Sequence, residues 1–186
     1  DDPGSFCEVI RTVFRSKNEE RAVEEPTEQQ KNIATNAYRL LHQWRTPPGS
    51  QKDGTYNAGA LVAWLEHVKA ACSASGHLEI AMTMVGHVLI YAPQDLDGLW
   101  LHRSVAAALN AKDAEDMRDG FRTELFNSRG VYGFTAGGQE RGLAAKYRRQ
   151  ADEVESAGFH RLANSLRELA ASYERDAERE SSRDPF

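Results

Sequence analysis

Apolar residues recur along most of the chain at intervals of three and four, the spacing that gathers side chains on one face of an α-helix. Residues 6–14 follow this pattern, and a second stretch follows it between the helix-start signal Pro26 and the stop signal Pro47. The stripe of the second stretch comprises Ile33, Ala37, Leu40, Leu41 and Trp44. Both stretches predict amphipathic helices that pack on the rest of the domain through their apolar faces.

The middle of the chain is the most apolar part and predicts the buried centre. Asn57 is placed to cap a helix that ends at Gly76, and Asp113 is placed to cap a later helix. From Asp53 to Asp113 there are only three Lys or Arg and six Asp or Glu, so charge is sparse on the helices between them. Their apolar positions include Leu61, Trp64, Leu65, Val68, Cys72, Leu78, Met82, Val85, Leu89, Val105, Ala106 and Leu109.

Two long helices are predicted beyond residue 138, and they meet at Gly158 as a helical hairpin. Their apolar positions are Leu143, Tyr147, Ala151 and Val154 on the first and Phe159, Leu162, Leu166, Leu169 and Tyr173 on the second. Charges of both signs occupy the remaining positions. Their spacing predicts ion pairs four residues apart within the first helix, from Arg148 to Asp152 and from Arg149 to Glu153.

These elements predict an all-α fold of seven to eight helices, an irregular helical bundle that ends in a long helical hairpin. At 186 residues the chain suits one domain over 1–186, with a possible division into a helical core over 1–127 and a hairpin over 139–180. Hydrophobic residues make up 40% and charged residues 27% of the chain, the balance of a globular protein. No apolar run approaches the roughly 20 residues that cross a bilayer, so no membrane partner is expected.

Five glycines fall within residues 126–143, which raises the question of a phosphate-binding loop. Gly133 and Gly138 have the P-loop separation, but Gln139 and Glu140 stand where that motif needs Lys and Ser or Thr. The favoured interpretation is a glycine-rich turn between two helices. The alternative is a recognition surface on a loop, formed by Arg129, Gln139, Glu140 and Arg141.

Motifs for catalysis and metal binding are missing from the sequence. The six histidines form no H-E-x-x-H pair, and no Glu-x-x-His or G-x-S-x-G motif occurs. Cys7 and Cys72 lie in apolar helical patterns and are expected to be reduced, buried thiols, as in cytoplasmic proteins. We therefore expect no cofactor, no metal and no catalytic residue.

Two other functions stay open. One is an enzyme or small-ligand-binding domain with a pocket between helices, for which His87, Asp97 and His102 are candidate residues together with Arg129 and Glu140. The second is a nucleic-acid-associated domain, although a net charge of −5 with no strongly basic segment argues against nucleic acid as a partner.

Four segments of the sequence are the basis of a resemblance to other proteins: "RLLHQWRTPPG", "DGLWLHRSVAAALN", "FNSRGVYGFTAGGQERGLAAKYR" and "RLANSLRELAASYERDAERE". Over residues 36–180 the chain resembles a helical region near the C-terminal end of large, uncharacterised bacterial proteins. The resemblance implies a bacterial, cytoplasmic module of a multidomain protein, and it implies no catalytic residue. The start at Asp1 without a methionine, close to a predicted helix, also favours a fragment or a trimmed chain.

The leading functional hypothesis is a non-catalytic interaction or scaffold module of a bacterial cytoplasmic protein or assembly. Its partner would be another protein or the remainder of a longer chain. Apolar helix faces and the loop around Arg129 are the expected contact surfaces, with buried aromatic anchors supplying most of the affinity.

Overall fold

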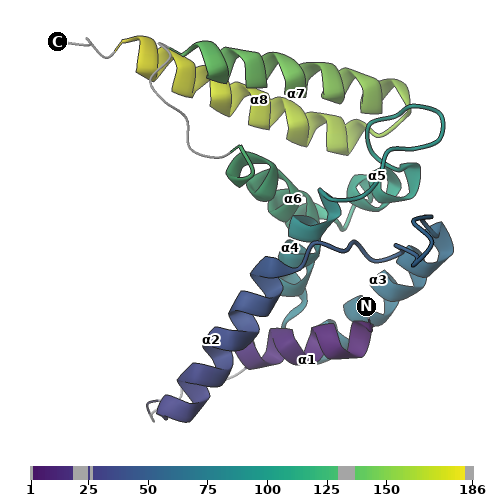
Figure 1. Ribbon diagram of the computed structural model, residues 1–186, viewed down its shortest axis with the longest axis vertical. Helices are drawn as coiled ribbons and strands as arrows, with labels where there is room; N and C mark the ends of the chain where they lie inside the picture. The colour runs from purple at the N-terminus through teal and green to yellow at the C-terminus, as the bar shows by residue number, and fades with distance from the viewer. Residues whose placement is uncertain (1, 19–24, 26, 130–136, 183–186) are drawn as a thin grey trace.

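The computed structural model describes residues 2–18, 25, 27–129 and 137–182, and this part of the chain contains eight helices and no strand. The helices are α1 Pro3–Val13, α2 Glu28–Gln43, α3 Ala58–Ala74, α4 Leu78–Leu89, α5 Arg103–Asn110, α6 Glu115–Asn127, α7 Gly138–Ser156 and α8 His160–Ser181. The predicted all-α fold is confirmed. Figure 1 shows α7 and α8 lying together at one end of the molecule, α4 and α6 at the centre, and α1, α2 and α3 at the other end.

Most of the predicted capping and turn residues are found at the ends of helices. The Asn57 side chain caps α3 by accepting a hydrogen bond from the Ala60 amide at 2.9 Å. Gly158, with φ of +92°, makes the turn between α7 and α8. The predicted cap at Asp113 is wrong: Ala114 holds that position. The Asp113 carboxylate instead accepts a hydrogen bond from Lys69 Nζ at 2.6 Å, which lowers the pKa of Asp113 and joins this turn to α3.

The central helices α4 and α6 approach each other so closely that their backbones touch. A Cβ atom added at Gly86 would lie 2.1 Å from the Met117 carbonyl oxygen, and one added at Gly120 would lie 2.0 Å from the Thr83 carbonyl oxygen. Because glycine has no side chain, each of these residues lets the backbone of the other helix approach at its position. The prediction that the middle of the chain forms the buried centre agrees with this packing.

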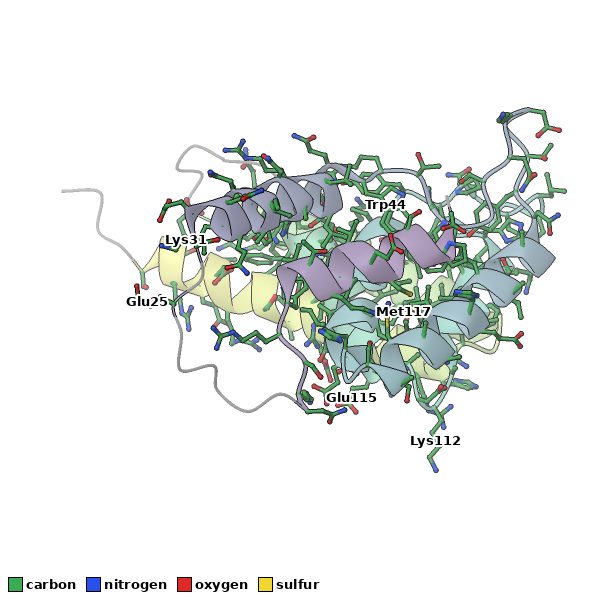
Figure 2. The ribbon with its side chains drawn as sticks, turned by 90° about the horizontal axis from the view of Figure 1, so that it is seen from below. Glu25, Lys31, Trp44, Lys112, Glu115 and Met117 are labelled. Atoms are coloured by element: carbon green, nitrogen blue, oxygen red, sulfur yellow. The ribbon has the colours of Figure 1, made fainter. Side chains whose placement is uncertain are left out.

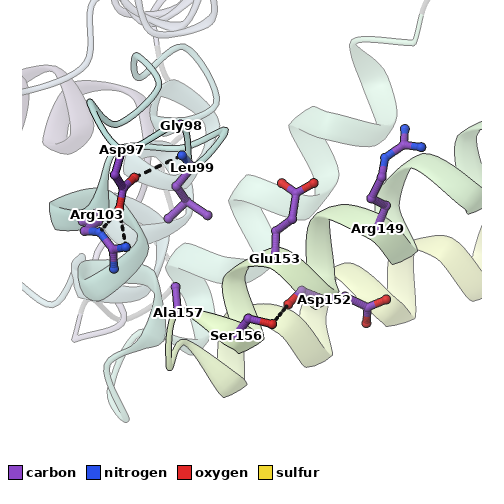
Figure 3. Close-up of a pocket in the computed structure, with 9 residues that line it drawn as sticks. All are labelled: Asp97, Gly98, Leu99, Arg103, Arg149, Asp152, Glu153, Ser156 and Ala157. Atoms are coloured by element: carbon purple, nitrogen blue, oxygen red, sulfur yellow. Dashed lines mark hydrogen bonds and ion pairs between the residues drawn. The ribbon is translucent and has the colours of Figure 1, made fainter.

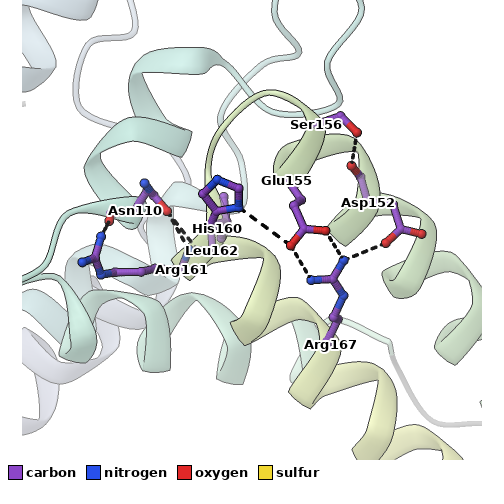
Figure 4. Close-up of polar contacts among 8 residues, drawn as sticks. All are labelled: Asn110, Asp152, Glu155, Ser156, His160, Arg161, Leu162 and Arg167. Atoms are coloured by element: carbon purple, nitrogen blue, oxygen red, sulfur yellow. Dashed lines mark hydrogen bonds and ion pairs between the residues drawn. The ribbon is translucent and has the colours of Figure 1, made fainter.

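The C-terminal hairpin is held to the centre by a stack of aromatic rings. Tyr173 of α8 is fully buried, and its ring centroid lies 5.7 Å from that of Tyr147 and 5.3 Å from that of Phe126 at the end of α6. Asn110 links α5 to the start of α8, since its Oδ1 accepts a hydrogen bond from the Arg161 amide at 2.7 Å (Figure 4). These contacts join α5, α6, α7 and α8.

The ion pairs of the hairpin cross between its two helices. Arg148 binds Glu174 with an Nη2 to Oε2 distance of 2.7 Å, and Asp152 binds Arg167 at 2.9 Å (Figure 4). The predicted pair from Arg148 to Asp152 within α7 is therefore wrong. The reason is that α8 lies alongside α7, so these side chains reach a partner across the hairpin.

In the N-terminal half, α1 packs on α3 through buried side chains. Cys7 and Cys72 are buried and free, as predicted, with their Sγ atoms 3.5 Å apart, and burial raises the pKa of Cys72 to about 12. His77 is also buried, with Nε2 3.0 Å from the Phe14 carbonyl oxygen and Nδ1 3.1 Å from Ser75 Oγ. His77 is thus a hydrogen-bonded packing residue that ties the segment after α1 to the start of α4.

The packing of α2 differs from the sequence-based expectation. No residue of α2 is fully buried, and Ile33 and Leu40 are 51% and 60% exposed. The helix lies along the edge of the molecule (Figure 1), where α1 is its main neighbour. Its half-buried side chains are Ala34, Ala37, Leu41 and, at the C-cap, Trp44. The predicted stripe is therefore only half covered, and its other half faces outward.

Candidate interaction site

A groove of about 650 Å³ lies between α1 and α2, and most of the side chains that line it are apolar. Figure 2 shows α1 and α2 side by side, with Trp44 labelled at the C-terminal end of α2. The apolar side chains that line the groove are Phe6, Val9, Leu40, Leu41, Trp44 and Trp64. Leu40 stands on its rim, where the exposed half of the α2 stripe begins.

Three aromatic side chains form a cluster along the groove. Ring centroids are 5.1 Å apart for Phe6 and Trp64, 5.3 Å for Phe6 and Trp44, and 5.7 Å for Trp44 and Trp64. These tilted arrangements are favourable for aromatic pairs. Trp64 is 6% exposed, and its Nε1 is buried without a hydrogen-bond partner among the described residues. Because each ring is held by two others, the cluster presents a preformed apolar surface.

Charge at the groove is confined to two residues that are already engaged. The Asp2 carboxylate caps α1 by accepting a hydrogen bond from the Ser5 amide at 2.7 Å, and this bond lowers the pKa of Asp2. The Arg45 guanidinium lies 4.8 Å from the centre of the Tyr91 ring and donates to the His42 carbonyl oxygen at 2.7 Å. The other groove side chains are uncharged. The groove can therefore bury an apolar partner.

On the other edge of α2, three aromatic rings form a row from the protein surface to α4. The Tyr38 and His42 ring centroids are 4.2 Å apart, and those of His42 and His87 are 6.2 Å apart. Burial lowers the pKa of His87; nearby Glu124 opposes this effect, and His42 adds to it. His87, a candidate pocket residue, is therefore placed where α2 meets α4, and it lines neither the groove nor the polar cleft described below.

The lowered pKa of His87 predicts a pH-dependent stability. An unfolded imidazole gains a proton near the ordinary pKa of 6.5, whereas folded His87 resists protonation. The unfolded state then binds more protons, so the free energy of unfolding should fall as the pH drops from about 7 to about 5.

The measurement is urea unfolding across this pH range for the parent and for His87→Gln. We expect a shallower pH dependence in His87→Gln, because the variant removes the group responsible. The exposed His67→Gln serves as the control and should keep the slope of the parent. Equal slopes in all three proteins would contradict the assignment.

A second hollow, a polar cleft of about 570 Å³, lies between the segment before α5 and helix α7 (Figure 3). Asp97 lines it, and its carboxylate is ion-paired with Arg103, whose Nε lies 2.7 Å away; this contact lowers the pKa of Asp97. Arg149 and Glu153 extend from α7 in Figure 3, and neither forms a hydrogen bond or ion pair with a described side chain. The sequence-predicted pair from Arg149 to Glu153 is therefore not formed.

The three candidate pocket residues do not share a site. His102 caps α5, where its Nδ1 accepts a hydrogen bond from the Ser104 amide at 3.2 Å, and its ring lies 4.7 Å from the Tyr56 ring. Asp97 is the only one of the three that lines the polar cleft. His87 lies apart from the other two, whereas Asp97 and His102 belong to the same segment before α5, where only Asp97 lines the cleft.

The candidate recognition residues lie at the ends of two helices. Arg129 follows α6; its guanidinium lies 4.3 Å from the centre of the Phe126 ring and 3.9 Å from Asp176 Oδ2. Arg141 donates to Ser181 Oγ at 2.6 Å. Gln139 and Glu140 share the first turn of α7, and Glu140 Oε2 is buried without a hydrogen-bond partner in the described part of the chain.

Residues 130–136, the centre of the glycine-rich stretch, lie outside the described residues. The start of α7 at Gly138 agrees with the prediction that a long helix follows the glycine-rich stretch. The recognition role of Arg129, Gln139, Glu140 and Arg141 stays a prediction. Arg129 and Arg141 contact α6 and α8, and these contacts fit a packing role equally well.

The described residues also bear on metal binding and on membrane insertion. No three His, Cys, Asp or Glu side chains among them are grouped so as to hold a metal ion. None of the helices described is long and apolar enough to cross a membrane.

Comparison with known proteins gives no assignment: no family model, no curated protein and no solved structure matches the chain. The resemblance over residues 36–180 therefore stays a prediction. Sequence reasoning found the apolar stripe of α2 but missed the groove. A signal was present beside the stripe: when Tyr38 is added to it, the apolar and aromatic positions of this helix spread over about 160° of its circumference at 100° per residue, more than one neighbouring helix covers.

Proposed function

We propose that this protein is a non-catalytic protein–protein interaction module, and that the groove between α1 and α2 receives an apolar helical segment of the partner. The observation that carries this proposal is the exposed apolar side chain of Leu40 on the rim of a groove that holds a preformed aromatic cluster, with exposed Ile33 further along the same helix. Burying a leucine side chain completely is worth about 1.5–3 kcal/mol, so covering these residues favours association. Aromatic residues in well-packed pockets are also the usual anchors of interfaces.

A helix is the occupant that the groove suits best. Two helices form its walls, and the side chains of a third helix can pack between them as ridges into grooves. The setting that we propose is a larger bacterial cytoplasmic protein or assembly, and the support for it is the resemblance over residues 36–180.

The test is site-specific photo-crosslinking. A photoreactive residue in place of Gln43, which lines the groove, should crosslink to a protein when the folded domain is irradiated in an extract of the source cells. The same residue in place of Leu96, a fully exposed loop position, is the matched control. Adding Leu40→Glu should abolish the product at Gln43, because it puts a charge on the apolar rim.

Crosslinking at Gln43 that is no stronger than at Leu96 would overturn the proposal, as would a product that persists in Leu40→Glu. The partner is identified from the mass of the crosslinked product, and a second copy of this chain counts as a partner in this experiment.

A second candidate function is binding of a small ligand that carries both charges, in the polar cleft. The specific observation in its favour is that Arg149 and Glu153, which line the cleft, have no ion pair among the described side chains. A thermal-shift screen of amino acids and short peptides tests it. A rise in Tm that Arg149→Ala abolishes supports the cleft, and the absence of any shift counts against it.

A further inference from the structure

The exposed edge of α2 carries a regular alternation of amide and apolar side chains. Its members, which we call the α2 seam, are Gln29, Ile33, Asn36, Leu40 and Gln43, and all are exposed. They are spaced by four, three, four and three residues, which is the spacing of the contact positions in a pair of packed helices. Since α1 covers the neighbouring face of α2, the seam is left open along the length of the helix.

We propose that the α2 seam pairs with the α2 seam of a second copy of this chain in an antiparallel, two-fold symmetric dimer. The inference rests on the proposed function, because Leu40 and Gln43 belong both to the seam and to the docking groove. It goes further by naming the partner. The chemistry of the seam is the reason for naming a second copy.

In a two-fold interface, residues near the axis meet their own copies. A charged side chain there would face a like charge, whereas an amide carries both a donor and an acceptor and can pair with itself. The five seam positions include no charged residue, although α2 carries charges elsewhere. Asn36 is the central member, so it lies nearest the axis, with Ile33 packed near Leu40 of the second copy.

The charges at the two ends of α2 favour the antiparallel direction. Glu25 stands before its N-terminal end, and Arg39 stands toward its C-terminal end. Lys31 is already paired with Glu28 within the helix, at 2.8 Å. Antiparallel helices place each acidic end beside a basic end of the partner, whereas parallel helices would place like charges together.

The size of the contact sets the expected affinity. With 16 residues, α2 is about 24 Å long at 1.5 Å per residue. One pair of helices of this length makes an interface at the small end of the range for specific complexes, so we expect a dissociation constant on the order of 10 μM.

The experiment is sedimentation equilibrium over a concentration series from roughly 1 μM to 1 mM, which brackets the affinity expected for a small interface. The parent should pass from monomer to dimer within this range. Asn36→Lys and Asn36→Glu should each raise the dissociation constant more than about tenfold, because each places like charges at the axis. Mixing the two variants should restore a dimer that contains one chain of each.

Thr35→Lys is the matched control, since Thr35 is exposed on the same helix and lies outside the seam. It should dimerise like the parent. Circular dichroism should show unchanged helix content in every variant, because the substituted positions are exposed.

A parent that stays monomeric throughout the series would overturn the inference. If that monomer still crosslinks through Gln43 to another protein, the proposed function stands with a different partner. A dimer that tolerates Asn36→Lys, or two Asn36 variants that fail to combine, would also overturn the antiparallel pairing. If neither dimerisation nor crosslinking occurs, both proposals fail.

Discussion

Replacing Gly120 with alanine is expected to lower the free energy of unfolding by about 3 kcal/mol, the upper part of the range for overpacked helix contacts. The added Cβ would lie 2.0 Å from the Thr83 carbonyl oxygen, and this atom belongs to the α4 backbone. A backbone atom cannot move aside as a flexible side chain does, so α4 and α6 must separate along their contact. Urea unfolding followed by circular dichroism measures the loss.

The matched control is Gly142→Ala in the interior of α7. No atom lies within 4 Å of the Cβ that would be added there, so only the helix propensity changes. This variant should gain about 0.5–1 kcal/mol. A Gly120→Ala protein as stable as the parent would show that α4 and α6 are not in backbone contact.

The second large effect is expected from Tyr173→Ala. The side chain is fully buried and stacks on both Tyr147 and Phe126, so it joins the hairpin to the end of α6. Truncating a buried aromatic side chain leaves a cavity and removes its transfer free energy, for a loss of about 4 kcal/mol. The free energy of unfolding of a small domain is only about 5–15 kcal/mol, so this substitution should remove a large part of it.

Tyr38→Ala is the comparison for this variant, because Tyr38 is 47% exposed and lies on the outer helix α2. Its loss should stay below about 1 kcal/mol, as for most substitutions away from the core. Equal losses in the two variants would show that the ring stack is no more important than a surface contact. Hydrogen exchange adds a second readout: amides of α7 and α8 should lose protection in Tyr173→Ala.

Stability and binding place different demands on the apolar residues of this chain. The rings of Phe6, Trp44 and Trp64 support one another, so they contribute to the fold while still lining the groove. Ile33 and Leu40 are exposed and contribute little to the fold. Substitutions at Ile33 and Leu40 therefore test binding with little effect on folding, which is the basis for using Leu40→Glu.

Local patterns in the sequence were enough to predict the helices and many of their ends. Periodicity, an asparagine cap at Asn57 and a positive-φ glycine at Gly158 act within a few residues of the chain, so they can be read without knowing the tertiary arrangement. The buried faces of α3 and α8 follow from the same periodicity, because each of these helices packs against neighbouring helices along its predicted stripe.

Which apolar faces stay open and which charges meet depends on how the helices pack in three dimensions. This packing left Ile33 and Leu40 exposed because α2 packs mainly on one neighbour, and it joined Arg148 to Glu174 across the hairpin. It also placed His87 away from the polar cleft that Asp97 lines, although both were candidates for one pocket between helices. These outcomes depend on how helices far apart in the sequence are positioned against one another, and no local pattern of residues encodes that arrangement.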